Sequence, residues 1–180
     1  IFPVCIQKSF FYSSFNAKEL QNYIELAEDQ EFIRQTLPAK NLCAFIADGS
    51  ILPRESGISS RPMKASVPFT SPDSLRISIN LPHKGKITGM GIPKGITLIV
   101  GGGYHGKSTL LNALELGVYN HIAGDGREYV ITDATALKLR SEDGRSIKDV
   151  DISLFINDLP NKKNTHCFST ADASGSTSQI

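Results

Sequence analysis

The spacing of apolar residues between positions 16 and 38 predicts one long helix. Asn16 is a favourable N-cap residue, and Glu19 stands where a capping-box carboxylate reaches back to it. Apolar residues recur at helical spacing at Leu20, Tyr23, Ile24 and Ala27. After a shift in the spacing, Phe32, Ile33 and Leu37 continue the same face. Pro38 is expected to stop the helix. The solvated face is expected to hold the acidic residues Glu25, Glu28, Asp29 and Glu31.

Four apolar runs after this helix are typical of strands. Residues 41–47 precede an Asp-Gly turn signal, and residues 75–81 alternate as in a strand with one face in water. Residues 87–92 are expected to continue as a second strand after the turn at 83–86. Residues 96–100 are apolar throughout and rich in β-branched side chains, which is typical of a central strand covered on both faces. Residues 51–63 are predicted to be loop, and residues 1–15, apolar and aromatic, receive no assignment.

The second half of the chain alternates short apolar segments with turn signals. A helix is predicted after residue 106, with Leu110, Leu111 and Leu114 on one face and Gly117 as its stop. Residues 129–132 and 136–140 are interpreted as short strands, and residues 141–146 as a tight turn. Residues 151–160 form a further apolar segment closed by a proline, and the last residues are mostly hydroxyl-bearing or small.

Composition limits the classes of protein to consider. The chain has 180 residues, 40% of them apolar, which suits one domain or one domain and a fragment. A net charge of +1 argues against a strongly basic nucleic-acid-binding protein. A local basic groove is still compatible with this total, and the clustered residues Lys138, Arg140, Arg145 and Lys148 are candidates for contacts with an RNA backbone. No apolar run has the length of a membrane helix, so no membrane partner is expected.

The cysteines and the first residue bear on the compartment. Cys5, Cys43 and Cys167 are scattered, which favours reduced and buried thiols in an intracellular protein. We therefore expect a cytoplasmic location, or an organelle such as the mitochondrion if a targeting segment precedes Ile1.

Residues 101–108 fit the phosphate-binding pattern G-x-x-x-x-G-K-[ST], between an apolar run and an amphipathic helix. Glycines let backbone N–H groups turn toward an anion, and the helix adds its N-terminal dipole. Lys107 is expected to bridge the β- and γ-phosphates, and Ser108 to place its hydroxyl on Mg²⁺. The predicted ATP-binding residues are Gly101, Gly102, Gly103, Tyr104, His105, Gly106, Lys107, Ser108 and Thr109.

Several segments resemble the predicted ATPases of the ABC class, a family without transmembrane domains. They are residues 47–57, 89–111, 117–132, 140–153 and 168–179. The resemblance implies an α/β fold, namely part of a P-loop NTPase domain of the ABC nucleotide-binding type with a mixed sheet flanked by helices. Residues 47–180 then form the N-terminal part of that domain, from Walker A to the signature motif. Residues 1–46 form a lead-in segment with one helix.

The run ASGSTSQ at 173–179 resembles the ABC signature motif. In that class the motif opens a helix and caps the γ-phosphate held by the partner's phosphate loop. The resemblance therefore implies a homodimer arranged head-to-tail across ATP. Ser174, Gly175 and Ser176 are the residues that it assigns to the partner's ATP.

The chain departs from the family pattern at several points. Tyr104 stands where the usual phosphate loop has glycine, and no glutamine occurs between the loop and Gln179. Asn157 or Asp158 is a candidate substitute for the Q-loop residue that contacts Mg²⁺. In this family the signature is normally followed by the Walker B aspartate, the catalytic glutamate and the switch histidine. The catalytic residues therefore stay unknown. The chain is interpreted as an internal piece of a longer ATPase.

Two functions remain open on this reading. The first is an ATP hydrolase whose conformational cycle acts on a macromolecule, with RNA suggested by the resemblance. The second is a clamp or scaffold that binds ATP without turnover. Three charged residues of the loop at 51–63 are interpreted as surface charges or as ligand contacts; they are Arg54, Glu55 and Arg61. Six others are interpreted as turn-forming and salt-bridging residues, or as groups that frame the nucleotide or the dimer interface; they are Asp125, Arg127, Glu128, Glu142, Asp143 and Arg145.

Overall fold

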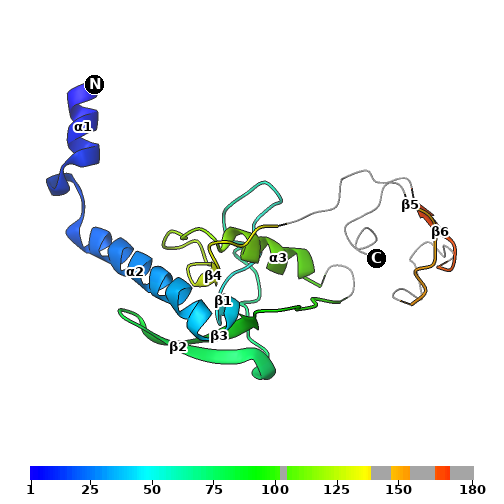
Figure 1. Cartoon of the computed structure of the whole chain (residues 1–180). Coiled ribbons are helices and arrows are strands. Elements are labelled where there is room, and N and C mark those ends of the chain that lie inside the picture. Colours follow the sequence, from blue (N-terminus) through cyan, green and yellow to red (C-terminus); the bar gives the residue numbers. More distant parts are fainter. Residues whose placement is uncertain (102–104, 139–146, 155–164, 171–180) are drawn as a thin grey trace. The chain divides into compact units, whose positions relative to one another are not determined.

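The computed structural model describes residues 1–101, 105–138, 147–154 and 165–170. They belong to two compact units, Ile1–Leu137 and Lys138–Ile180. Figure 1 shows the order of their elements along the chain. None of the described helices is long and apolar enough to cross a bilayer.

Three helical segments begin the first unit. Residues 1–15, which the pattern left unassigned, contain α1 (Phe2–Phe10) and a 3-10 turn at Tyr12–Ser14, with no buried residue in either. The long predicted helix is confirmed as α2 (Ala17–Ala39), where the Asn16 side chain accepts hydrogen bonds from the N–H groups of Lys18 and Glu19. It ends one residue beyond Pro38, and Asn41 turns the chain with a φ of 55°.

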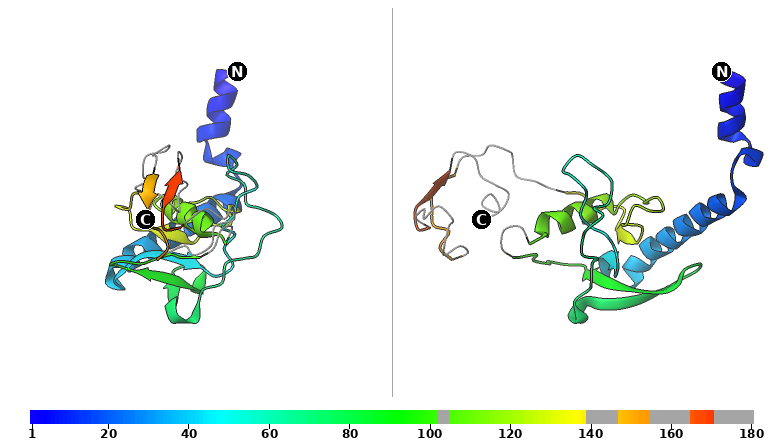
Figure 2. Two further views of the ribbon diagram at one scale, coloured as in Figure 1. Left: turned by 90° about the vertical axis from the view of Figure 1, so that its right-hand side faces the viewer. Right: turned by 180° about the vertical axis from the view of Figure 1, so that it is seen from behind.

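A four-stranded antiparallel sheet follows, in the order β2-β3-β1-β4. Its strands are β1 (Leu42–Ala47), β2 (Arg76–Leu81), β3 (Gly85–Pro93) and β4 (Val130–Thr132). All four confirm predicted strands. Figure 2 shows the β2–β3 hairpin extending along α2, with which it is in contact.

The two faces of this sheet are covered by different helices, which confirms the α/β class. Ile33 and Leu37 of α2 pack with Phe45 and Ile131 on one face. On the other face, Ala44, Ile46 and Val130 pack with Ala113, Leu110 and Leu114 of α3 (Lys107–Leu116). Leu111, predicted on the same side as Leu110, is instead 41% exposed. Every strand pair described is antiparallel, so the parallel pairs of a mixed sheet are not among the described residues.

The strand predicted at 96–100 is not formed. These residues have no regular structure, and Ile96, Leu98 and Val100 are largely exposed. The central strand covered on both faces is β1, which has strands on either side of it. An apolar run becomes a central strand only where neighbouring strands supply its hydrogen bonds, and no described strand pairs with 96–100.

The second unit contains β5 (Ile147–Val150) and β6 (Phe168–Thr170), paired antiparallel, with Ile152 buried beside them. The described part of the predicted strand at 136–140 is irregular. The prediction of buried cysteines is wrong, because Cys5 and Cys167 are exposed and Cys43 is half-buried. All three are free thiols, which fits their scattered spacing.

Polar residues of α2 bond two loops, the β2–β3 turn and the segment between α3 and β4. Asp29, expected on the solvated face, is 1% exposed, and its carboxylate accepts hydrogen bonds from the N–H groups of His83 and Lys84 at 3.0 Å each. Gln30, also 1% exposed, donates to the carbonyls of His121 and Glu128 at 2.8 and 2.9 Å. The acidic run is therefore not uniform: Asp29 faces inward because it satisfies backbone donors of the β2–β3 turn.

A buried ionic cluster joins the loop after β1 to the loop before β4. Arg54 donates to the Asp125 carboxylate at 2.8 Å and to the Asp125 carbonyl at 2.6 Å. The same carboxylate lies 2.8 Å from Nδ1 of His121. Arg127, 2% exposed, donates through Nε and Nη2 to the carbonyl of Leu52. These contacts fix the two loops against each other.

Burial and the nearby charges change the pKa values in this cluster. Loss of solvent lowers the pKa of His121, with Arg54 and Arg127 adding to the effect and Asp125 opposing it. Burial also lowers the pKa of Arg127 to about 10, a value at which the guanidinium stays charged at neutral pH.

We expect Asp29→Ala to lower the free energy of unfolding by about 2–3 kcal/mol, because it leaves two backbone donors of the β2–β3 turn without their charged acceptor. Urea unfolding of the chain measures this. Glu25→Ala is the matched control, since among the described residues its side chain hydrogen-bonds only Gln21 of the same helix, and it should cost much less. Equal effects of the two substitutions would contradict the assigned role.

We also expect unfolding stability to depend on pH through His121. The folded chain keeps His121 neutral at pH values where the unfolded chain, with a pKa near 6.5, already binds a proton. Stability should therefore fall as the pH decreases from about 7.5 to about 5.5. His121→Gln should flatten this dependence, and His105→Gln, at an exposed position, should leave it unchanged. A wild-type pH slope in the His121 variant would refute the prediction.

Candidate functional site

The described part of the phosphate loop ends in a glycine that its backbone requires. Gly106 has a φ of 80°, in the left-handed region, and is the N-cap of α3. A residue with a Cβ is strained in this conformation, which explains the second glycine of the pattern. Gly102, Gly103 and Tyr104 lie outside the described residues, so the predictions for them stay predictions.

The two ends of the loop are close together. Nζ of Lys107 donates a hydrogen bond to the carbonyl of Gly101 at 2.5 Å. A Cβ on Gly101 would lie 3.9 Å from both the Lys107 Cδ and the His105 Cβ. The lysine ammonium is thus at the mouth of the loop that it is predicted to serve. His105 is exposed, so its side chain contributes no buried contact there.

The first turn of α3 is suited to an anion. No side chain in the described part of the chain caps the helix, and no acidic residue lies in its first turn. The first helical hydrogen bond runs from the N–H of Leu110 to the carbonyl of Gly106 at 2.9 Å. The preceding N–H groups therefore have no acceptor within the helix, and the helix dipole places partial positive charge beside them. A phosphate group fits this combination of charge and donors.

Ser108 and Thr109 follow the lysine in the same turn of α3. Ser108 is exposed and Thr109 is half-buried. A hydroxyl beside a bound phosphate is the ligand type that P-loop proteins use for Mg²⁺. The residues present therefore fit Mg·ATP, with the loop backbone and Lys107 for the phosphates and Ser108 for the metal.

The far end of α3 is held by residues that sequence reasoning missed. The Thr132 hydroxyl donates to the carbonyl of Leu114 at 2.8 Å. Arg34 of α2 donates to the carbonyls of Gly117 and Thr132 at 3.3 and 2.8 Å, which places its positive charge at the negative end of the helix dipole. Nothing in the spacing of Arg34 or Thr132 indicated these contacts.

Gly117 permits this close approach, as well as ending the helix as predicted. A Cβ at Gly117 would lie 2.6 Å from the Thr132 hydroxyl oxygen and 3.1 Å from the Thr132 nitrogen. The C-terminal end of α3 is therefore fixed directly against β4. The phosphate loop lies at the opposite end of a helix whose position is determined by the sheet.

The other predicted groups are distributed over several places. Asp125 forms a salt bridge, as one interpretation predicted, but its partner is Arg54, whose side chain is only 13% exposed, so the prediction of a surface charge at Arg54 is wrong. Arg127 bonds a backbone carbonyl instead. Glu55 and Arg61 are exposed. Glu128 accepts a hydrogen bond from the N–H of Gly124. Outside the described residues lie Arg140, Glu142, Asp143, Arg145, Asn157, Asp158, Ser174, Gly175 and Ser176.

Comparison with known proteins gives two matches. The model of the ABC ATPase P-loop domain matches residues 16–180. An uncharacterized protein of the archaeon Methanocaldococcus jannaschii, MJ1628, is 36% identical over 140 residues. The matched region is 73% of this chain and 31% of that protein, so the chain spans about a third of its relative's length.

The family match includes the uncapped start of α3, the glycine at its N-cap and the lysine folded onto the loop. It also covers the sheet and the helix α2 that support them. A P-loop domain of this kind binds a nucleotide through these elements. The chain belongs to the ABC ATPase P-loop domain family.

Proposed function

We propose that this domain binds Mg·ATP at the loop that precedes α3. The proposal rests mainly on one observation, the lysine ammonium of Lys107 beside an uncapped helix N-terminus. Lys107 and the backbone N–H groups of residues 101–106 would hold the phosphates, and Ser108 would help to hold Mg²⁺. The bound metal would neutralise phosphate charge during an in-line attack by water.

We further propose that the full-length protein hydrolyses ATP and works as a head-to-tail homodimer. The family supports this arrangement, in which Ser174, Gly175 and Ser176 of one copy contact the γ-phosphate held by the other. Opening and closing of the dimer would then act on a macromolecular partner. RNA is the partner class that the sequence resemblance favours. Because the chain spans only part of its relative, these statements concern the whole protein.

Lys107→Ala should weaken ATP binding by at least about tenfold, because it removes the charge that faces the phosphates. Titration of a fluorescent ATP analogue with Mg²⁺ measures the affinity. Lys64→Ala removes an exposed lysine from a loop outside the site and should bind as the wild type does. An unchanged affinity in the Lys107 variant would reject the site assignment.

Ser174→Arg should prevent dimerisation driven by ATP, because a long cation would occupy the place of the γ-phosphate contact. Sedimentation velocity with and without Mg·ATP, on the full-length protein, gives the dimer fraction. Ser60→Arg adds the same side chain at an exposed loop position and should dimerise normally. The dimer proposal fails if Ser174→Arg and the wild type give the same ATP-dependent dimer fraction.

A further inference from the structure

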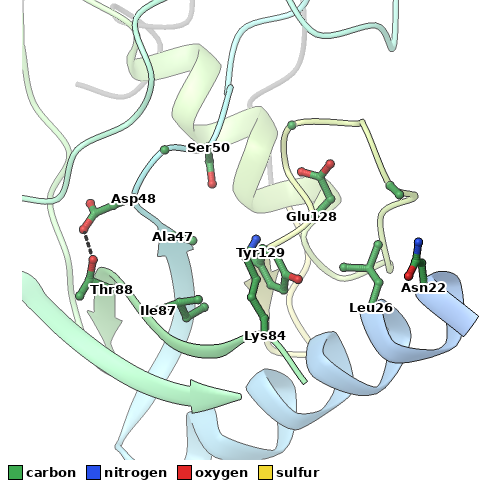
Figure 3. Close-up of a pocket in the computed structure, with 13 residues that line it drawn as sticks. Asn22, Leu26, Ala47, Asp48, Ser50, Lys84, Ile87, Thr88, Glu128 and Tyr129 are labelled. Carbon is green, nitrogen blue, oxygen red and sulfur yellow. Dashed lines mark hydrogen bonds between the residues drawn. The ribbon is translucent and has the colours of Figure 1, made fainter. Parts of the chain in front are cut away.

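A second pocket, of about 490 Å³, lies away from the phosphate loop. Its walls come from the N-terminal half of α2, the end of β1, the β2–β3 hairpin and residues 123–129, as Figure 3 shows. None of the residues that line it belongs to residues 101–109. Its volume is in the range of sites for small ligands.

A hydroxyl on the wall of this pocket forms no hydrogen bond within the described residues. Ser50 is 8% exposed, and Figure 3 shows its hydroxyl directed into the pocket. No hydrogen bond from this hydroxyl occurs in the part of the chain that the structure describes, although both backbone groups of Ser50 are bonded. A hydroxyl can both donate and accept hydrogen bonds, so Ser50 has capacity for a polar group of a ligand.

Two opposite charges line the pocket without pairing with each other. The ammonium of Lys84 lies 4.2 Å from the centre of the Tyr129 ring. The carboxylate of Glu128 accepts only the N–H of Gly124 within the described ranges, at 2.7 Å. Neither side chain forms a described ion pair, so each has capacity for a charged ligand group.

The third charge in the lining is already satisfied. One oxygen of Asp48 accepts from the N–H of Ser71 at 2.6 Å, and the other from the Thr88 hydroxyl at 2.8 Å. Arg76 lies 3.9 Å from the same carboxylate. Asp48 therefore belongs to the framework of the pocket, which leaves one positive and one negative group for a ligand.

Buried residues of α2 fix both of the remaining charges. Asp29 accepts the N–H of Lys84 itself, and Gln30 donates to the carbonyl of Glu128 itself. These two neighbours on α2 are each 1% exposed. Burying polar groups costs free energy unless they are bonded, and here the bonds position the backbone of the two charged residues on different walls.

The rest of the wall is partly aliphatic. Leu26, Ala47, Ile87 and Ala123 line the pocket beside the charged groups. The Tyr129 phenol stays protonated and able to donate a hydrogen bond, because burial and the nearby carboxylates of Asp29 and Glu128 raise its pKa to about 12. A dianion would be opposed by Glu128 and a simple cation by Lys84, whereas a molecule with both charges meets a partner for each.

We propose that this pocket binds a small zwitterion of the amino-acid class with an aliphatic side chain. Lys84 and Ser50 contact its carboxylate, Glu128 contacts its ammonium, and the aliphatic wall receives its side chain. None of these contacts involves residues 101–109, so the proposal does not depend on the nucleotide site.

Leucine, isocaproate and isoamylamine test the proposal, because the second lacks the ammonium group and the third lacks the carboxylate. Calorimetric titration of the whole chain should show leucine binding at least about tenfold more tightly than either analogue. No binding of leucine at millimolar concentration, or equal affinities for the three compounds, would overturn it.

Two variants separate recognition from folding. Lys84→Met should weaken leucine and isocaproate binding by at least about tenfold without weakening isoamylamine binding. Glu128→Gln should weaken leucine and isoamylamine binding by a similar factor without weakening isocaproate binding. Lys86→Met, two residues along the same hairpin and outside this pocket, should bind all three as the wild type does. Uniform losses for all ligands would contradict specific contacts. Lys107→Ala should bind leucine normally, so failure of the nucleotide proposal would not affect this result.

Discussion

The first unit depends on the buried polar residues of α2. Asp29 and Gln30 satisfy backbone groups of loops, and Arg34 satisfies carbonyls at the ends of α3 and β4. Backbone N–H and C=O groups that leave water need hydrogen bonds, and irregular loops lack the regular ladder that supplies them in helices and strands. By placing an acceptor, an amide and a guanidinium at successive points of one helix, the chain anchors the β2–β3 turn, the loop before β4 and the end of α3.

This anchoring connects the two faces of the sheet. α2 covers one face with Ile33 and Leu37, while Arg34 reaches the end of α3, the helix that covers the other face. The C-terminal carbonyls of α3 are bonded by Thr132 and Arg34, whereas no described side chain caps its first turn. A helix whose C-terminal end is fixed in this way presents the phosphate loop on a rigid support.

Local patterns predicted the parts of the fold that depend on local physics. The Asn16 cap, the stop at Gly117 and the alternation of residues 76–81 act through neighbouring backbone groups, and all three are confirmed. The run at 96–100 was misassigned because its apolar composition is similar to that of β1, and only strand neighbours distinguish them. Asp29 was misassigned for a related reason: the N–H groups that donate to its carboxylate lie more than 50 residues away in the sequence.

The sequence by itself determined the phosphate-loop pattern that places this protein in its family. The glycine, lysine and serine at 106–108 lie within one turn of chain, so their spacing carries the information. Only the tertiary structure decided which groups support that turn and which groups share a second pocket. Arg34 meets Gly117, Lys84 meets Tyr129, and Asp29 and Gln30 hold the walls beside Ser50, because the sheet brings distant segments together. Such contacts depend on packing between elements, which no local spacing encodes.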